Sequence, residues 1–122
     1  MKKVLLVIIC LLLVGCGSKE SEEIKPGKIN CEQMEEIMKG DNNPQLIDVR
    51  SEDEYKEGHL YNSMNIPYDS VVSGIEGNEI ITKDTPIIVY CKSGARSSKA
   101  YESLVNAGYK KVYDLGAMSN CK

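Results

Sequence analysis

Hydrophobic residues in this chain fall into short apolar runs separated by stretches with helical spacing, which indicates alternating strands and helices. The runs at residues 45–50, 87–90 and 111–115 are rich in Ile, Val and Leu and predict buried strands. Apolar residues three to four positions apart, together with capping residues, predict helices at residues 31–39, 52–56, 68–75 and 97–107. A brief extended segment is expected at 62–67. The alternation predicts an α/β fold with a parallel sheet and helices on both faces.

The first fifteen residues form a separate segment with the features of an export signal. Lys2 and Lys3 precede an unbroken apolar run at residues 4–14. This run is shorter than the roughly twenty apolar residues that a permanent membrane-spanning helix needs. An uncleaved hydrophobic anchor is the alternative interpretation.

The end of this run, Leu13-Val14-Gly15-Cys16, is similar to the lipobox of bacterial lipoproteins, in which the cysteine is lipidated and becomes the first residue after cleavage. The resemblance implies a lipoprotein signal peptide at 1–15 and a lipid on Cys16. The polar residues 16–28 then form a lipidated flexible tether, and residues 29–122 form the domain. We therefore expect the protein to be extracytoplasmic and lipid-anchored to a bacterial membrane.

Composition and charge narrow the range of functions. The chain has 122 residues, of which 42% are hydrophobic, enough for one modest core. Its formal net charge is −3, and loss of Lys2 and Lys3 with the signal peptide makes it more negative. Nucleic acid is therefore not an expected partner.

Three thiols remain after the signal peptide and the lipidated cysteine are set aside: Cys31, Cys91 and Cys121. An odd number outside the cytoplasm leaves at least one reactive thiol. Cys31 lies on the apolar stripe of a predicted helix, where packing is favoured over redox chemistry. The chain has no Cys-x-x-Cys pair and a single histidine, His59, so neither a metal site nor a cofactor is predicted.

The stretch that follows the 87–90 strand carries the chemistry. Cys91 lies where this strand passes through a tight loop into a helix, a geometry that aims loop amides and a helix N-terminus at one point. Lys92 and Arg96 add positive charge, which favours a nucleophilic thiolate. Gly94 supplies the backbone freedom that a closed loop needs. An inert, buried cysteine is the alternative.

Charged residues also end the 45–50 strand, at the same edge of the predicted sheet. Asp48 and Arg50 could face Cys91 across a crevice, or could fix the surrounding loops as structural charges. His59 follows a glycine turn and is expected to be a hydrogen-bonded loop anchor. Cys121 lies just beyond the 111–115 strand, so it is interpreted either as a resolving or relay thiol for Cys91 or as a bystander.

Four separated motifs together resemble a single-domain rhodanese over about residues 29–118. They are Leu46-Ile47-Asp48-Val49-Arg50, Glu54-Tyr55 with Gly58-His59-Leu60, Asn65-Ile66-Pro67, and Cys91-Lys92-Ser93-Gly94-Ala95-Arg96-Ser97. The resemblance implies a rhodanese-like sulfurtransferase fold and the transfer of sulfane sulfur. In this reaction Cys91 takes sulfur from a small anionic donor such as thiosulfate, becomes a persulfide and passes the outer sulfur to a thiol or cyanide.

The resemblance also implies a role for each residue of the motifs. Arg96 would orient the donor, and the substrate-binding loop would comprise Lys92, Ser93, Gly94, Ala95 and Ser97. Asp48, Arg50 and His59 would be structural. Only four residues separate Cys91 from Arg96, one fewer than in cysteine phosphatases, which favours sulfur over phosphate. The alternative is a rhodanese-like redox-sensing or protein-binding module.

Overall fold

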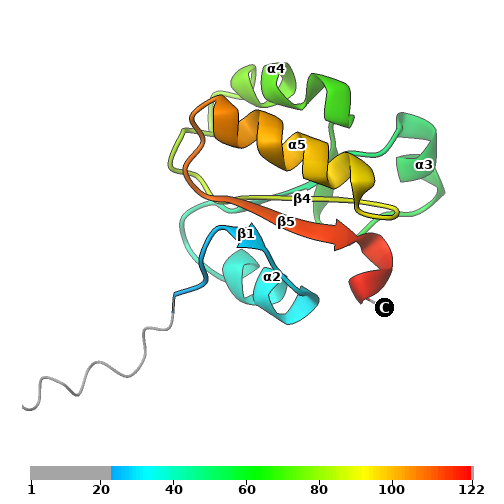
Figure 1. Ribbon diagram of the computed structural model, residues 1–122, viewed down its shortest axis with the longest axis horizontal. Helices are drawn as coiled ribbons and strands as arrows, with labels where there is room; N and C mark the ends of the chain where they lie inside the picture. Colours follow the sequence, from blue (N-terminus) through cyan, green and yellow to red (C-terminus); the bar gives the residue numbers. More distant parts are fainter. Residues whose placement is uncertain (1–22, 122) are drawn as a thin grey trace, which may run out of the picture.

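Five parallel strands form one sheet in the computed structural model, which describes residues 23–121 (Figure 1). The order across the sheet is β1-β5-β4-β2-β3. The strands are β1 Gly27–Lys28, β2 Gln45–Asp48, β3 Ser63–Asn65, β4 Ile87–Cys91 and β5 Val112–Ala117. The α-helices are α2 Cys31–Met38, α3 Glu52–Glu57, α4 Val71–Glu76 and α5 Ala95–Asn106, with 3₁₀ turns η1 Tyr68–Ser70 and η2 Met118–Cys121. The expected signal peptide, Cys16 and most of the expected tether lie outside the described residues.

Helices cover both faces of the sheet, as the alternating pattern predicted (Figure 1). Helix α2 packs on one face, here called the α2 face, and α4 and α5 pack on the other, here called the α5 face. Side chains along a strand point to opposite faces in turn. Ile88 and Tyr90 of β4 accordingly lie in the cluster on the α2 face, while Ile87, Val89 and Cys91 lie in the cluster on the α5 face. All five residues of β4 are buried, as expected for the central strand of a parallel sheet.

Capping residues determine where two of the predicted helices begin. The side chain of Asn30 accepts from the backbone N–H of Gln33, and that of Ser51 accepts from the N–H of Glu54; each pair forms a complete capping box. Both helices therefore start where the sequence predicted. Helix α5 starts two residues earlier than predicted, because Gly94 adopts a left-handed conformation and acts as its N-cap.

Strand β1 corrects the expected boundary between tether and domain. Gly27 and Lys28, placed in the flexible tether from their polar composition, pair with Tyr113 and Asp114 of β5. A two-residue segment is too short to show an alternating pattern of apolar and polar residues, so the sequence does not predict this strand. It forms because β5 offers an edge with which it can pair.

Among the described residues 23–121, no helix has the length and apolar character needed to cross a membrane.

A disulfide between Cys31 and Cys121 corrects the roles expected for both cysteines. It joins the first residue of α2 to the last residue of η2, with 5.2 Å between the α-carbons and 90 residues between the two positions. Cys31 is therefore more than a packing residue. Cys121 is not a partner of Cys91, because the disulfide packs against the cluster on the α2 face whereas Cys91 lies in the cluster on the α5 face.

Removing the disulfide should destabilise the domain. A cross-link across a loop of this length lowers the entropy of the unfolded chain by an amount worth about 4.6 kcal/mol. We expect Cys31→Ser and Cys121→Ser each to lower the free energy of unfolding in urea by up to about that amount, and the double variant to lose no more than either single variant. Addition of a reductant should lower the free energy of unfolding of the parent to that of the variants. Additive losses in the double variant would contradict a shared cross-link.

Candidate active site

Cys91 lies at the carboxyl end of β4, where the central strand passes into α5. Its side chain is fully buried, and it is the free cysteine of the described chain. The sulfur accepts hydrogen bonds from the backbone N–H groups of Gly94, at 3.0 Å, and Ser97, at 3.3 Å. Two amide donors and the N-terminus of α5 thus converge on one sulfur atom, an arrangement that stabilises negative charge at that point.

The conformation of Gly94 closes the loop around this sulfur. Its φ of 104° lies in the left-handed region, which side chains rarely adopt. A Cβ at this position would also come within 3.9 Å of the Gly116 α-carbon, so the loop lies close to the end of β5. Ser97 is buried, and its hydroxyl donates to the Gly94 carbonyl at 3.2 Å. The contact of Ser97 with the sulfur is made through its backbone N–H rather than its hydroxyl.

Three other loop residues are exposed to solvent, unlike the buried Cys91 and Ser97. Lys92, Ser93 and Ala95 are exposed, and Lys92 has no ion-pair partner among residues 23–121. The loop therefore presents one uncompensated positive charge to solvent beside Cys91.

Arg96 forms an ion pair that the sequence did not predict. Its two terminal nitrogens bind the two carboxylate oxygens of Glu54 at 2.7 and 3.1 Å. Both side chains are about one-third exposed. The Arg96 guanidinium is the main cause that lowers the pKa of Glu54 to about 2, and the Ser51 N–H adds to the effect. The sequence identified Glu54 as a capping residue and as part of a family motif, but nothing near it indicated a partner 42 residues away.

Asp48 and Arg50 bind each other in the interior, which supports their interpretation as structural charges. An Arg50 terminal nitrogen lies 2.6 Å from an Asp48 carboxylate oxygen, and it also donates to the Gly58 carbonyl at 2.7 Å. The Tyr90 hydroxyl donates to the same Asp48 carboxylate at 2.9 Å. Hydrogen bonding to Asp48 raises the pKa of Arg50, and burial raises the pKa of Tyr90 to about 12. The network joins the ends of β2 and β4 to the loop after α3.

His59 lies on the surface, as expected for a loop anchor. Its ring stacks on Tyr55 with the centroids 3.7 Å apart, and Nδ1 hydrogen-bonds the Tyr55 carbonyl at 2.8 Å. Neither contact joins it to Cys91.

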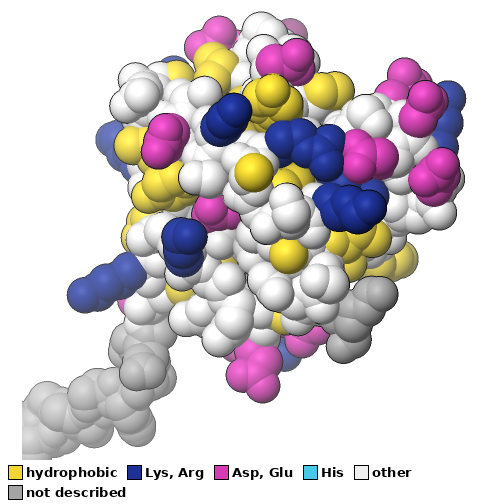
Figure 2. All heavy atoms as spheres, turned by 45° about the vertical axis from the view of Figure 1, so that its right-hand side comes forward, with side chains coloured by type: hydrophobic (Ala, Val, Ile, Leu, Met, Phe, Trp, Pro, Cys, Tyr) yellow, Lys and Arg dark blue, Asp and Glu magenta, His cyan; other side chains and the backbone are white. Residues whose placement is uncertain are grey.

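A cavity of about 330 Å³ opens beside the Cys91 loop at the carboxyl ends of the strands. Figure 2 turns this end of the molecule forward and shows basic and acidic side chains adjacent to one another. The lining residues are Arg50, Glu54, Glu57, Lys92, Met118 and Ser119. We refer to this cavity as the mouth of the site. Within the described part of the chain, no cluster of three or more His, Cys, Asp or Glu side chains could hold a metal ion.

The ion pair at the mouth should make folding stability depend on acid pH. The pKa of Glu54 is lower in the folded chain than its ordinary value of 4.5, so its stabilising effect is complete above pH 4.5 and is lost as the pH falls towards 2. We expect the free energy of unfolding of Glu54→Gln to fall less steeply than that of the parent in this window. Glu52→Gln is the matched control, because Glu52 is an exposed glutamate of the same helix. Equal slopes for Glu54→Gln and the parent would contradict the pairing.

Comparison with known proteins agrees with this geometry. The sequence profile of the family described as "Rhodanese-like domain" matches residues 30–119. Thiosulfate sulfurtransferase GlpE of Coxiella burnetii is 36% identical over 70 residues, which cover 57% of this chain and 63% of that protein. Thiosulfate sulfurtransferase 18 of Arabidopsis thaliana is 39% identical over 83 residues, covering 59% and 61%. The matches thus span just over three-fifths of each relative.

A solved structure described as "rhodanese with anions from E. coli" superposes with a TM-score of 0.59 and 31% identity, covering 63% of this chain and 89% of that one. The profile match covers most of the chain, and the parallel sheet, the Cys91 loop and the structural neighbour agree with it. This chain therefore belongs to the rhodanese-like family.

Proposed function

We propose that this protein is a sulfurtransferase that moves a sulfane sulfur atom through a persulfide on Cys91. The observation that carries the proposal is the free thiol of Cys91, which accepts hydrogen bonds from two backbone amides at the N-terminus of α5. The names of the relatives, thiosulfate sulfurtransferases, support the reaction class.

The reaction consists of two displacements and requires no external oxidant or cofactor. The Cys91 thiolate attacks the outer sulfur of thiosulfate, the sulfur–sulfur bond of the donor breaks, and sulfite leaves with the bonding electrons. An acceptor thiolate or cyanide then attacks the outer sulfur of the Cys91 persulfide and releases the Cys91 thiolate. The amides of Gly94 and Ser97 stabilise the negative charge before and after transfer.

Arg96 and Lys92 receive the anionic donor in this proposal. Glu54 occupies both terminal nitrogens of Arg96, but a guanidinium carries five N–H donors, so some remain for a ligand. Lys92 supplies the uncompensated charge at the mouth. Because Glu54 offsets much of the Arg96 charge, a small dianion is attracted less strongly than the sequence alone suggested.

A non-catalytic redox-sensing or protein-binding module is the alternative function. A protein-binding module needs neither the retained thiol nor its two amide donors, so these features favour chemistry at Cys91. Turnover of thiosulfate by the parent distinguishes a sulfurtransferase from a redox sensor, because a sensor would also need the Cys91 thiol but would not transfer sulfur.

Substitution of the site residues tests the mechanism. Cys91→Ser should lower sulfur transfer from thiosulfate by more than about 10³-fold, because a serine hydroxyl is hardly ionised at neutral pH. Arg96→Ala should lower kcat/KM for thiosulfate by about 10- to 100-fold, the range expected for loss of a hydrogen bond to a charged group. It should affect a neutral sulfur donor much less.

Controls separate these roles from general damage to the fold. Lys99→Ala removes another basic residue of α5, whose nitrogen lies over the Tyr68 ring, and should leave kcat/KM for thiosulfate unchanged. Equal losses with charged and neutral donors in Arg96→Ala would contradict anion recognition. Hydrolysis of an aryl phosphate at a rate that rivals sulfur transfer would reverse the choice of reaction.

We further propose that the domain acts outside the cytoplasm, held to a bacterial membrane by lipid on Cys16. The basic and apolar residues of the first segment and the Leu13-Val14-Gly15-Cys16 sequence support this location. The Cys31–Cys121 disulfide is independent support, because such bonds persist in oxidising compartments.

Processing of the full chain tests this location. In a bacterial host, Cys16→Ala should give an uncleaved precursor or a protein released from the membrane fraction, whereas Cys31→Ser should be processed like the parent. A Cys16→Ala protein that is cleaved and retained in membranes as the parent is would contradict lipidation.

A further inference from the structure

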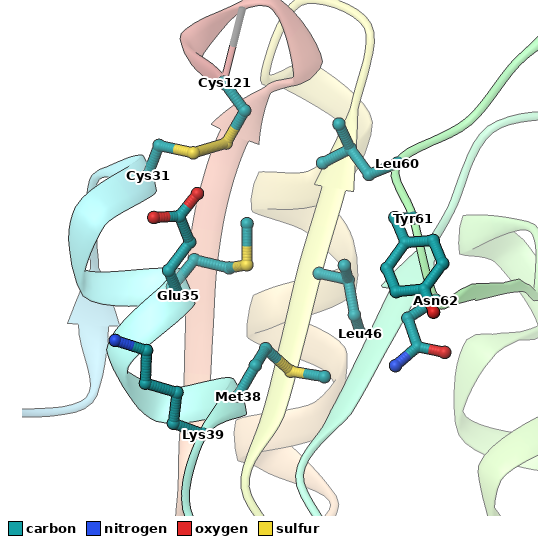
Figure 3. Close-up of a pocket in the computed structure, with 10 residues that line it drawn as sticks. Cys31, Glu35, Met38, Lys39, Leu46, Leu60, Tyr61, Asn62 and Cys121 are labelled. Carbon is teal, nitrogen blue, oxygen red and sulfur yellow. A yellow bond between two sulfur atoms is a disulfide. The ribbon is translucent and has the colours of Figure 1, made fainter.

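The Cys31–Cys121 disulfide forms one end of an apolar pocket on the α2 face (Figure 3). Cys91 packs in the cluster on the α5 face, so this pocket is separate from the Cys91 site. The pocket has a volume of about 360 Å³ and lies between α2 and the loop that precedes β3. Its apolar lining comprises Met34, Met38, Leu46, Leu60 and Tyr61. Both cysteines are partly exposed, so the disulfide is not sealed inside the protein.

Tyr61 is the unusual member of this lining. Its exposed fraction is 90%, the highest among the large hydrophobic residues of the described chain. Tyrosine in such a position is typical of contact surfaces, where it supplies apolar area at little entropic cost. An exposed aromatic ring therefore stands at the opposite side of a pocket whose end is a reducible bond.

We propose that the Cys31–Cys121 pair is a second reactive site, a thiol–disulfide exchange site for a protein dithiol of the Cys-x-x-Cys class that docks an apolar side chain in this pocket. The disulfide indicates which kind of partner the pocket would bind. A dithiol reduces a disulfide to two thiols and leaves no mixed disulfide behind, because its second thiol resolves that intermediate. The apolar lining and Tyr61 provide contact area around the bond, which a small reductant would not use.

The exchange balances as a two-electron transfer. A partner thiolate attacks the sulfur of Cys121, the bond to Cys31 breaks, and Cys31 leaves as a thiolate at the N-terminus of α2, where the helix dipole favours negative charge. The partner's second thiolate then attacks its own sulfur in the mixed disulfide and releases Cys121. The partner becomes a disulfide, and Cys31 and Cys121 take up protons from water.

Reduction would act on the Cys91 site through η2. Met118 and Ser119 of this turn line the mouth beside Lys92, and Asn120 lines a second hollow with Ser93 and Gly94 of the loop. The disulfide anchors this turn to α2. Among residues 23–121, the Asn120 side chain adds one hydrogen bond, to the Leu115 carbonyl at 3.1 Å. Cleavage of the disulfide removes the covalent anchor, so we expect the wall over the Cys91 loop to loosen.

Peptide mapping of the full chain tests the exchange site. Trypsin cleavage after lysine places Cys31, Cys91 and Cys121 in three different peptides, 29–39, 84–92 and 112–122, so the redox state of each is read separately. A purified thioredoxin-type protein should reduce the Cys31–Cys121 bond of the folded chain faster than dithiothreitol at equal dithiol concentration. The same protein with its resolving cysteine replaced by serine should be trapped on peptide 112–122.

Tyr61→Ala tests docking in the pocket. It should slow reduction by the thioredoxin-type protein by about fivefold, as expected for loss of an aromatic contact, and leave reduction by dithiothreitol unchanged. Ile80→Ala is the matched control, because Ile80 is an exposed hydrophobic residue that does not line this pocket. Equal rates of reduction for Tyr61→Ala and the parent would overturn docking in the pocket. Reduction by the thioredoxin-type protein that is no faster than by dithiothreitol would overturn the exchange site. Trapping on peptide 29–39 would overturn attack on Cys121.

The coupling to Cys91 has a readout that does not depend on sulfur transfer. Alkylation of peptide 84–92 by iodoacetamide should be severalfold faster in the chain with a reduced Cys31–Cys121 pair than in the oxidised chain. Cys31→Ser, which lacks the bond under all conditions, should match the reduced chain. Identical alkylation rates in the oxidised and reduced parent would show that η2 does not control access to Cys91.

Discussion

The two hydrogen bonds from the Gly94 and Ser97 amides to the sulfur of Cys91 are the interaction on which the site depends. They require β4 to end at Cys91, Gly94 to adopt a left-handed conformation and α5 to begin at Ala95. Each requirement is a property of the fold rather than of a separate catalytic side chain. The chemistry of Cys91 therefore follows from how the central strand of the sheet connects to α5.

A buried ionic network holds the surroundings of this loop in place. The carboxylate of Asp48 binds Arg50 and the Tyr90 hydroxyl, and Arg50 reaches the Gly58 carbonyl beyond α3. Removal of one member would leave a buried charge without its partner, a strongly destabilising change. The network positions α3, and α3 carries the glutamate that binds Arg96. The structural charges thus act on the mouth of the site without contact with Cys91.

The sequence predicted β2, β3, β4 and β5, the helices and the Cys91 loop because these features follow from local patterns: apolar runs, capping boxes and a glycine beside basic residues. It placed β1 in the tether. It did not predict the Glu54–Arg96 pair or the Cys31–Cys121 disulfide, whose partners are 42 and 90 residues apart. From the shared edge of the sheet, Cys121 was interpreted either as a resolving or relay thiol for Cys91 or as a bystander, and its pairing with Cys31 was missed. In the structure Cys91 and Cys121 pack on opposite faces of the sheet. The alternation of side chains along a strand predicts the face of Cys91, but the face of Cys121 depends on how η2 packs, which the sequence does not show.

Transfer of sulfur to Cys91 is the central claim, and the intact mass of the protein tests it most directly. After incubation with thiosulfate and removal of excess donor, the full chain should gain the mass of one sulfur atom, located on tryptic peptide 84–92 and removed by cyanide. The Cys31–Cys121 disulfide should remain intact. An unchanged mass, or added sulfur confined to the peptides of Cys31 or Cys121, would contradict a Cys91 persulfide.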